Sequence, residues 1–208
     1  PAWAARPMSS AGTGALIAVS ACVVLLAGGA RLWQFAMFIP VGALGIVALL
    51  IDNPYRIERI RAFLDPYADA EGSGFHMIQS MIAIANGEGF GRGLGNGLQK
   101  FGYLPEDHTD FLFAVICEEL GIAGAGLVLA LFLILIWSGI AIARRERDPM
   151  LRLATLGVMA TVGFQAVINV VVVTGVGPTK GIALPLVSSG GTGWILTCFS
   201  LGLVIAVD

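Results

Sequence analysis

Five long apolar runs constrain this chain more than any other feature of its sequence. Each is long enough to cross the hydrocarbon core of a bilayer as a helix, which takes about 20 residues. Only 12% of the 208 residues are charged, about half the share found in a soluble globular domain. The sequence therefore predicts a single all-α unit over residues 1–208, a polytopic transmembrane helical bundle. Its five spans are expected at 11–29, 32–51, 111–143, 154–175 and 182–207.

The overall charge and the cysteines exclude several classes of function. A net charge of −2 argues against nucleic acid as a partner, because nucleic-acid-binding domains carry basic patches. The three cysteines lie far apart within apolar runs, so they predict neither a disulfide framework nor a metal motif. Because the chain starts at Pro1 without a basic segment or a cleavage site, we interpret it as an internal piece of a longer protein.

Basic residues in the short connections predict how the spans are oriented. The first and third connections are rich in arginine, with Arg31, Arg144, Arg145, Arg147 and Arg152. The fourth connection, on the other side of the membrane, contains a single basic residue, Lys180. Connections rich in lysine and arginine stay in the cytoplasm. Residues 52–110 are therefore expected to form a large extracytoplasmic loop.

This outer loop is expected to contain short helices. Residues 52–67 have the pattern of a short charged helix that is broken at Pro66. Residues 75–85 are typical of a helix that ends at Asn86 and Gly87. The helix would lie on the membrane or pack on the spans through an apolar stripe, which consists of Phe75, Ile78, Ile82 and Ala85.

Every second residue from Gly87 to Gly97 is a glycine, in the sequence GEGFGRGLGNG. A phosphate-binding loop is not indicated, because the stretch has neither the GxGxxG spacing nor a GK[ST] motif and no strand precedes it. We interpret it as a mobile or tightly bent loop beside a substrate.

The stretch from Lys100 to Gly121 crowds ionisable groups against the apolar run that begins at Phe111. These groups are Glu106, Asp107, His108 and Asp110. Ionisable groups at such a position are functional candidates, because they are costly near hydrocarbon. Capping of the next helix by Thr109 or Asp110 would explain one polar residue, not four.

Asp110 is the candidate general base of this cluster. It precedes a helix, whose dipole favours the carboxylate form. His108 is an alternative base or an interfacial polar residue. A metal site formed by His76 and His108 is poorly supported, because no cluster of further ligands accompanies them.

Polar and helix-breaking residues also interrupt the last two apolar runs. Gln165 and Asn169 share one face of the fourth run and are expected to hydrogen-bond to neighbouring spans, with a substrate path as the alternative. The fifth run begins PTKGIALPLVSSGGTG and is interrupted at Pro185. Broken helices with small residues line cavities in transporters and membrane enzymes, while close helix packing is the other interpretation.

Three motifs together resemble one known family. They are YLPEDHTDFLFAVICEELG, FLDPYADAEGSGFHMIQSMIAIANGEGFGRGLG and PTKGIALPLVSSGGTG. The chain resembles the SEDS family (FtsW, RodA and SpoVE) over residues 7–207, and its PTKG form is most like the FtsW branch. These proteins are polytopic peptidoglycan glycosyltransferases with ten spans. The five runs look like the second half of that fold.

The resemblance implies the polymerisation of lipid II into glycan strands during cell division. Asp110 stands at the Asp of the family's HTDF motif, the proposed catalytic base for the sugar 4-hydroxyl of the acceptor. Residues expected to bind substrate are Lys100, Glu106, His108, Thr109, Lys180, Ser188 and Ser189. No metal site is expected, and the need for a divalent cation, Mg²⁺ or Mn²⁺, is left open.

The resemblance also implies a place and partners. The place is the cytoplasmic (inner) membrane at the division septum, with the active site on the extracytoplasmic face. Expected partners are a class B penicillin-binding protein, other division proteins and membrane lipids. The chain departs from the family where RPMSSAGTG lacks an expected Asp and where Ser189 replaces an aromatic residue. The alternatives are a lipid-precursor flippase or transporter and a non-catalytic division scaffold.

Overall fold

The computed structural model describes residues 11–31, 33–35, 37, 40, 61–72, 74–99, 110–178, 181–189 and 191–207. In these residues the protein consists of helices and connecting segments, without a strand, so the expected all-α class is confirmed there. The elements are α1 (Ala11–Ala27), the 3-10 helix η2 (Pro66–Asp69), α4 (Phe75–Gly87), α5 (Leu112–Arg145), α6 (Pro149–Val173) and α7 (Gly191–Val207).

Three of the five predicted spans coincide with helices. The runs 11–29, 111–143 and 154–175 correspond to α1, α5 and α6. Of these, α5 and α6 are long and apolar enough to cross a membrane, whereas α1 and α7 are shorter apolar helices. Most of the run 32–51 lies outside the described residues.

The start of the fifth predicted span is wrong. Residues 181–189 form an irregular segment with turns, and α7 begins only at Gly191. Pro185 has no N–H for a helical hydrogen bond and restricts the preceding residue. Leu186 has a φ of 63°, which is incompatible with a right-handed helix. These two residues keep the segment out of the helix.

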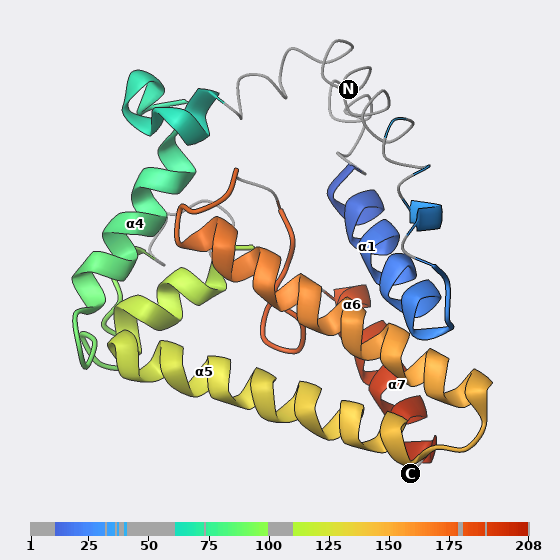
Figure 1. Ribbon diagram of the computed structural model, residues 1–208. Helices are drawn as coiled ribbons and strands as arrows, with labels where there is room; N and C mark the ends of the chain where they lie inside the picture. Colours follow the sequence, from blue (N-terminus) through green and yellow to red (C-terminus); the bar gives the residue numbers. More distant parts are fainter. Residues whose placement is uncertain are drawn as a thin grey trace, which may run out of the picture.

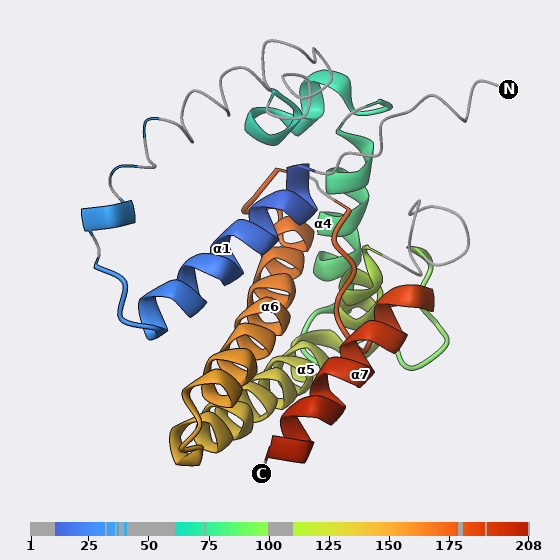
Figure 2. The ribbon, with the colours of Figure 1, turned by 90° about the vertical axis from the view of Figure 1, so that its right-hand side faces the viewer.

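Helix α6 is central to the bundle (Figures 1 and 2). Helices α1 and α5 pack along it, and α7 contacts it less extensively. α1 and α6 are antiparallel, because Gly28 lies beside Leu153 and Val24 lies beside Gly157. The turn after α1 therefore lies at the same end as the connection between α5 and α6. This agrees with the prediction that the first and third connections share one side.

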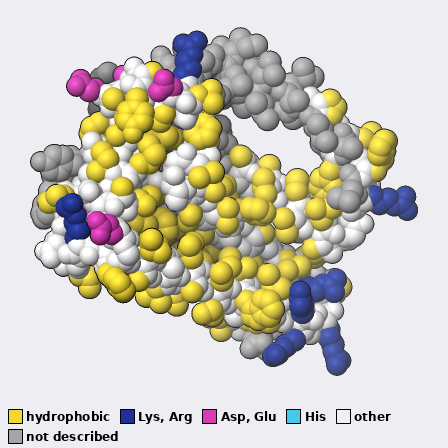
Figure 3. Space-filling view, turned by 60° about the vertical axis from the view of Figure 1, so that its left-hand side comes forward, with side chains coloured by type: hydrophobic (Ala, Val, Ile, Leu, Met, Phe, Trp, Pro, Cys, Tyr) yellow, Lys and Arg dark blue, Asp and Glu magenta, His cyan; other side chains and the backbone are white. Residues whose placement is uncertain are grey.

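This end of the bundle is rich in exposed arginine. Arg144, Arg145, Arg147 and Arg152 are all exposed around the connection between α5 and α6. Figure 3 shows basic side chains gathered at the lower right, while hydrophobic side chains cover much of the face beside them. Large apolar side chains such as Ile122, Leu133 and Trp137 of α5 are exposed, as expected for helices that face lipid.

Helix α5 changes direction at Gly121, which has a φ of 64° and a ψ of −161°. Residues 112–120 therefore run in a different direction from residues 122–145 (Figure 1). The second part alone is about 36 Å long at 1.5 Å per residue, enough to cross a bilayer.

Helix α4 has the predicted extent but packs through a different face. It runs from Phe75 to Gly87 and contacts mainly α5. Its buried residues are Met77, Ser80, Ala83 and Gly87. The predicted apolar stripe of this helix lies on the face next to the buried one, where Ile82 is 40% exposed.

The apolar core lies where α4, the start of α5 and the end of α6 meet the segment 181–189. Phe111, Phe113, Val173 and Leu184 are buried together there. The hydroxyl of Ser80 in α4 donates a hydrogen bond to the carbonyl oxygen of Val173 (2.6 Å). This core therefore fixes α4, α5 and α6 at the end of the bundle away from the arginines.

Candidate functional site

Asp110 lies just before α5 and is half-buried. The N-cap position of α5 is Phe111, whose own side chain makes no capping hydrogen bond. The alternative interpretation of Asp110 as the N-cap is therefore wrong.

Asn169 joins Asp110 to the segment that precedes α7. Its side-chain nitrogen Nδ2 donates to the carbonyl oxygens of Asp110 and Ile182, both at 2.7 Å. Two carbonyl acceptors identify this atom as the nitrogen of the amide. The prediction that Asn169 makes hydrogen bonds to other parts of the bundle is confirmed, but its partners are connecting segments rather than spans.

Gly181 brings main chain directly against the carboxylate of Asp110. A Cβ atom at this position would overlap Oδ2 of Asp110, so a larger residue would displace either the carboxylate or the segment. Ile182 and Leu184 are buried and anchor the segment on either side of Ala183. The carboxylate of Asp110 thus lies between the start of α5 and the segment 181–189.

Ser188 and Ser189 lie further along the same segment. Ser188 is 1% exposed, and its Oγ accepts a hydrogen bond from the main-chain nitrogen of Leu184 (2.9 Å). The indole nitrogen of Trp194 donates to the carbonyl oxygen of Ser188 (2.6 Å). Ser189 is exposed. The hydroxyl of Ser188 therefore stabilises the turn.

The glycine-rich loop is tightly bent and docks onto the break in α5. The main-chain nitrogens of Arg92 and Gly93 donate to carbonyl oxygens of α5, at 3.0 and 2.9 Å. In return, the nitrogen of Ile122 donates to the carbonyl oxygen of Glu88 (3.1 Å). A Cβ atom at Gly91 or Gly121 would overlap the opposing main chain. Gly91 and Gly121 are thus explained by the close approach of two backbones.

Two carboxylates of α5 hold the rest of this loop. Glu118 is 0% exposed, and its two oxygens accept hydrogen bonds from the nitrogens of Leu98 and Gln99, both at 3.1 Å. Glu119 accepts from the nitrogens of Gly95 (3.1 Å) and Gly97 (3.4 Å). Both oxygens of the buried Glu118 side chain are therefore matched by main-chain donors.

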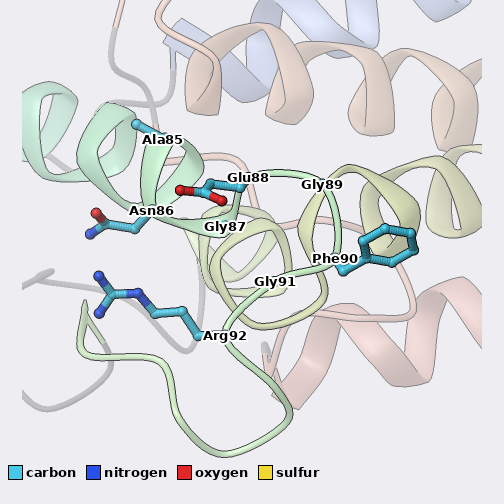
Figure 4. A pocket seen from close by; sticks show the side chains of 8 residues that line it. All are labelled: Ala85, Asn86, Gly87, Glu88, Gly89, Phe90, Gly91 and Arg92. Carbon is cyan, nitrogen blue, oxygen red and sulfur yellow. The ribbon is translucent and has the colours of Figure 1, made fainter.

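A hollow of about 410 Å³ lies over the start of this loop and is lined by residues 85–92. Figure 4 shows the side chains of Asn86 and Arg92 extending to the same side, with the guanidinium group below the amide in this view, while Phe90 extends to the opposite side. Glu88 lines the same hollow. Among the described residues, no three His, Cys, Asp or Glu side chains gather closely enough to hold a metal ion.

Five of the predicted site residues lie outside the described residues: Lys100, Glu106, His108, Thr109 and Lys180. The structure adds His76 of α4, whose ring stacks on Phe111, with the centroids 5.8 Å apart. This contact depends on how α4 crosses α5, and no local sequence signal indicates it. His76 therefore belongs to the surroundings of Asp110.

Fold and site together define a class of protein. Apolar helices form a membrane-type bundle, and carboxylates, a bent glycine-rich loop and an irregular segment meet toward one end of it. The family model of the FtsW, RodA and SpoVE cell cycle proteins matches residues 7–208. The chain belongs to this family, as its motifs predicted.

Relatives and a solved structure agree with this assignment. The probable peptidoglycan glycosyltransferase FtsW of Halomonas elongata is 44% identical over 94% of this chain and 50% of its own length. Stage V sporulation protein E of Bacillus subtilis is 42% identical, over 95% of this chain and 54% of its own length. This chain spans about half the length of the curated relatives it matches.

A chain from a peptidoglycan synthase complex is structurally similar. It superposes with a TM-score of 0.73 and 31% identity, over 92% of this chain and 53% of its own length. That complex is described as coordinating polymerization and crosslinking. The two chains are therefore similar in the arrangement of their helices as well as in sequence.

Proposed function

We propose that this protein is a peptidoglycan glycosyltransferase that polymerises lipid II during cell division, with Asp110 as its general base. Relatives that are 40–46% identical carry the name probable peptidoglycan glycosyltransferase FtsW. The observation that carries the proposal is the close approach of the main chain at Gly181 to the carboxylate of a half-buried Asp110. Such a carboxylate is held in place without being sealed from a substrate.

The proposed chemistry needs one base. The carboxylate of Asp110 takes the proton from the 4-hydroxyl of the acceptor sugar. The hydroxyl oxygen then forms a bond to the anomeric carbon of the second sugar. The bond from that carbon to the diphosphate breaks, and undecaprenyl pyrophosphate leaves with the electron pair. Basic groups favour such a transition state, because negative charge develops on the leaving group.

Further residues are proposed to contact the substrate. Lys180, next to Gly181 in the sequence, and Lys100 supply positive charge for the diphosphate. Glu106, His108, Thr109 and Ser189 would contact the sugars or peptide. The hydroxyl of Ser188 is engaged with Leu184. Its contribution is therefore proposed to be the shape of the segment, not direct contact.

The proposed location follows from the two ends of the bundle. Asn169, which holds Asp110, lies one turn before the end of α6, and α6 begins at the arginine-rich end. If that end is cytoplasmic, the site faces the extracytoplasmic side of the inner membrane, where the sugars of lipid-linked precursors are displayed. A class B penicillin-binding protein at the septum is the proposed partner, which the similarity to a polymerization and crosslinking complex supports.

The test is polymerisation of purified lipid II by the full-length protein with its transpeptidase partner. Wild-type protein should produce glycan strands, and Asp110→Ala should lose that activity while folding and inserting normally. A flippase or a scaffold would tolerate the loss of this base. Undiminished polymerisation by Asp110→Ala would overturn the proposal.

A further inference from the structure

Asn169 makes a bridge that packing of α6 alone does not require. One amide group joins two segments that lie 59 and 13 residues away in the sequence. Both hydrogen bonds are 2.7 Å long, and the side chain is 2% exposed. A buried donor with two acceptors has a single satisfactory orientation, so the bridge fixes the distance between the two carbonyl groups.

The two bridged segments are those that define the surroundings of the Asp110 carboxylate. One acceptor is the carbonyl group of Asp110 itself, at the start of α5. The other is Ile182, whose neighbour Gly181 lies against the carboxylate of Asp110. If the segment moved away, the space beside Oδ2 would open. The position of the proposed base thus depends on both hydrogen bonds of Asn169.

We propose that Asn169 is a positioning residue for Asp110, and this inference rests on the proposed function. Its amide holds the main chain of Asp110 and the segment at 181–182 in one arrangement, so that the carboxylate meets the acceptor hydroxyl in reactive geometry. Asn169 itself does not contact the reacting atoms. Reaction rates are sensitive to such geometry, because a displacement of about 1 Å can cost about 100-fold.

A double-mutant cycle with Asp110→Asn tests the proposal, using the full-length protein and its transpeptidase partner. Asn169→Leu keeps a similar side-chain volume and removes both donors. We expect it to lower kcat for lipid II polymerisation by about 10- to 100-fold, with the KM for lipid II changed much less. In the Asp110→Asn background the same change should have little further effect, because the base that it positions is absent.

Ser80→Ala is the matched control. Ser80 also makes a buried side-chain bond to a carbonyl group at this end of α6, with Val173 as its acceptor. It has no part in the proposed machinery. Any loss of kcat in Ser80→Ala reflects general loosening of the bundle, and should therefore be small and the same in both backgrounds.

The outcomes separate the inference from the function on which it rests. Asp110→Asn with full activity would end the proposed function and the inference together. A strongly impaired Asp110→Asn with measurable residual activity, together with equal fold-losses from Asn169→Leu in both backgrounds, would assign Asn169 a purely structural role. Near-normal kcat in Asn169→Leu would overturn the inference as well.

A second variant covers the case in which Asn169→Leu does not fold. Asn169→Asp is almost isosteric but directs a carboxylate oxygen at two carbonyl groups, so the bridge is lost. It should show the same fall in kcat and the same dependence on Asp110. If neither variant folds while Ser80→Ala folds normally, Asn169 is required for folding, and the positioning role is refuted.

Discussion

At the scale of single residues, the surroundings of Asp110 depend on a glycine without a side chain and on an asparagine that donates hydrogen bonds. Gly181 has no side chain, and this absence lets main chain lie directly against the carboxylate. Asn169 fixes that main chain through Ile182. The carboxylate therefore has one defined position beside the segment 181–189.

Gly181→Ala should displace the carboxylate of Asp110. The added Cβ would overlap Oδ2, so either the carboxylate or the segment must move. We expect polymerisation of lipid II to fall by about 10- to 100-fold with normal membrane insertion. Gly193→Ala is the control, because a Cβ there has no atom within 4 Å. Equal activities of the two variants would show that the approach at Gly181 is unimportant.

At the scale of elements, the break in α5 and the glycine-rich loop form one unit. The loop donates main-chain hydrogen bonds to the turn before Gly121 and accepts one from the residue after it. The break in the helix thus exposes main-chain groups that the loop satisfies, as buried main chain requires.

Gly121→Ala should destabilise the protein. Its positive φ and the nearby main chain of Gly91 leave no room for a side chain. We expect a cost of about 1–3 kcal/mol or more, seen as a lower midpoint of thermal unfolding in detergent. Gly126→Ala, on the same helix with open space around it, should be neutral or slightly stabilising. A midpoint unchanged by Gly121→Ala would contradict this account of the break.

Glu118→Gln should also lower the unfolding midpoint. An amide nitrogen would replace one of the two carboxylate oxygens that accept from Leu98 and Gln99, and two donors would then face each other. The expected cost is about 1–3 kcal/mol. Glu119→Gln should cost less, because that residue is only half-buried. A larger effect at Glu119 would show that the buried pairing of Glu118 is not the main anchor.

The sequence predicts those elements that depend on local pattern. Long apolar runs predict α1, α5 and α6, and the Asn86–Gly87 pair predicts the end of α4. The break at Gly121 is not predictable in this way, because Gly126 lies in the same helix in a similar apolar context and does not interrupt it. Long-range hydrogen bonds from the glycine-rich loop decide which glycine breaks the helix.

The same limit applies to the candidate site. Crowded ionisable residues single out Asp110, but nothing local predicts that Asn169 reaches its carbonyl group from 59 residues away. The hydroxyl of Ser188 looks like a ligand-binding group in the sequence, yet it accepts a hydrogen bond within its own turn. Such roles depend on how α6 and the last segment pack, which periodicity does not encode.

At the scale of the whole molecule, the bundle has two chemically different ends. Exposed arginines gather where α5 joins α6, and the carboxylates Asp110, Glu118 and Glu119 lie toward the other end. Such asymmetry orients a membrane protein with the basic end in the cytoplasm. The candidate site would then face the cell exterior or periplasm.

This orientation can be measured by cysteine labelling in a variant whose native cysteines are replaced. Asn96→Cys, in the exposed glycine-rich loop, should react with an impermeant maleimide in intact cells whose outer envelope is open to the reagent. Met150→Cys, which is exposed beside the arginine-rich connection, should react only after the cells are permeabilised. The reverse pattern would overturn both the topology and the proposed location of the site.

The most direct test of the central claim is the polymerisation rate of Asp110→Asn. Asparagine keeps the size of the side chain, and the main-chain carbonyl group that accepts from Asn169 is unchanged. Fold and membrane insertion should therefore survive. It cannot take a proton, and general-base assistance is worth roughly 10²–10⁴-fold. We predict a loss of that size, with a smaller loss for Asp107→Asn. Normal expression with near wild-type polymerisation by Asp110→Asn would contradict the account.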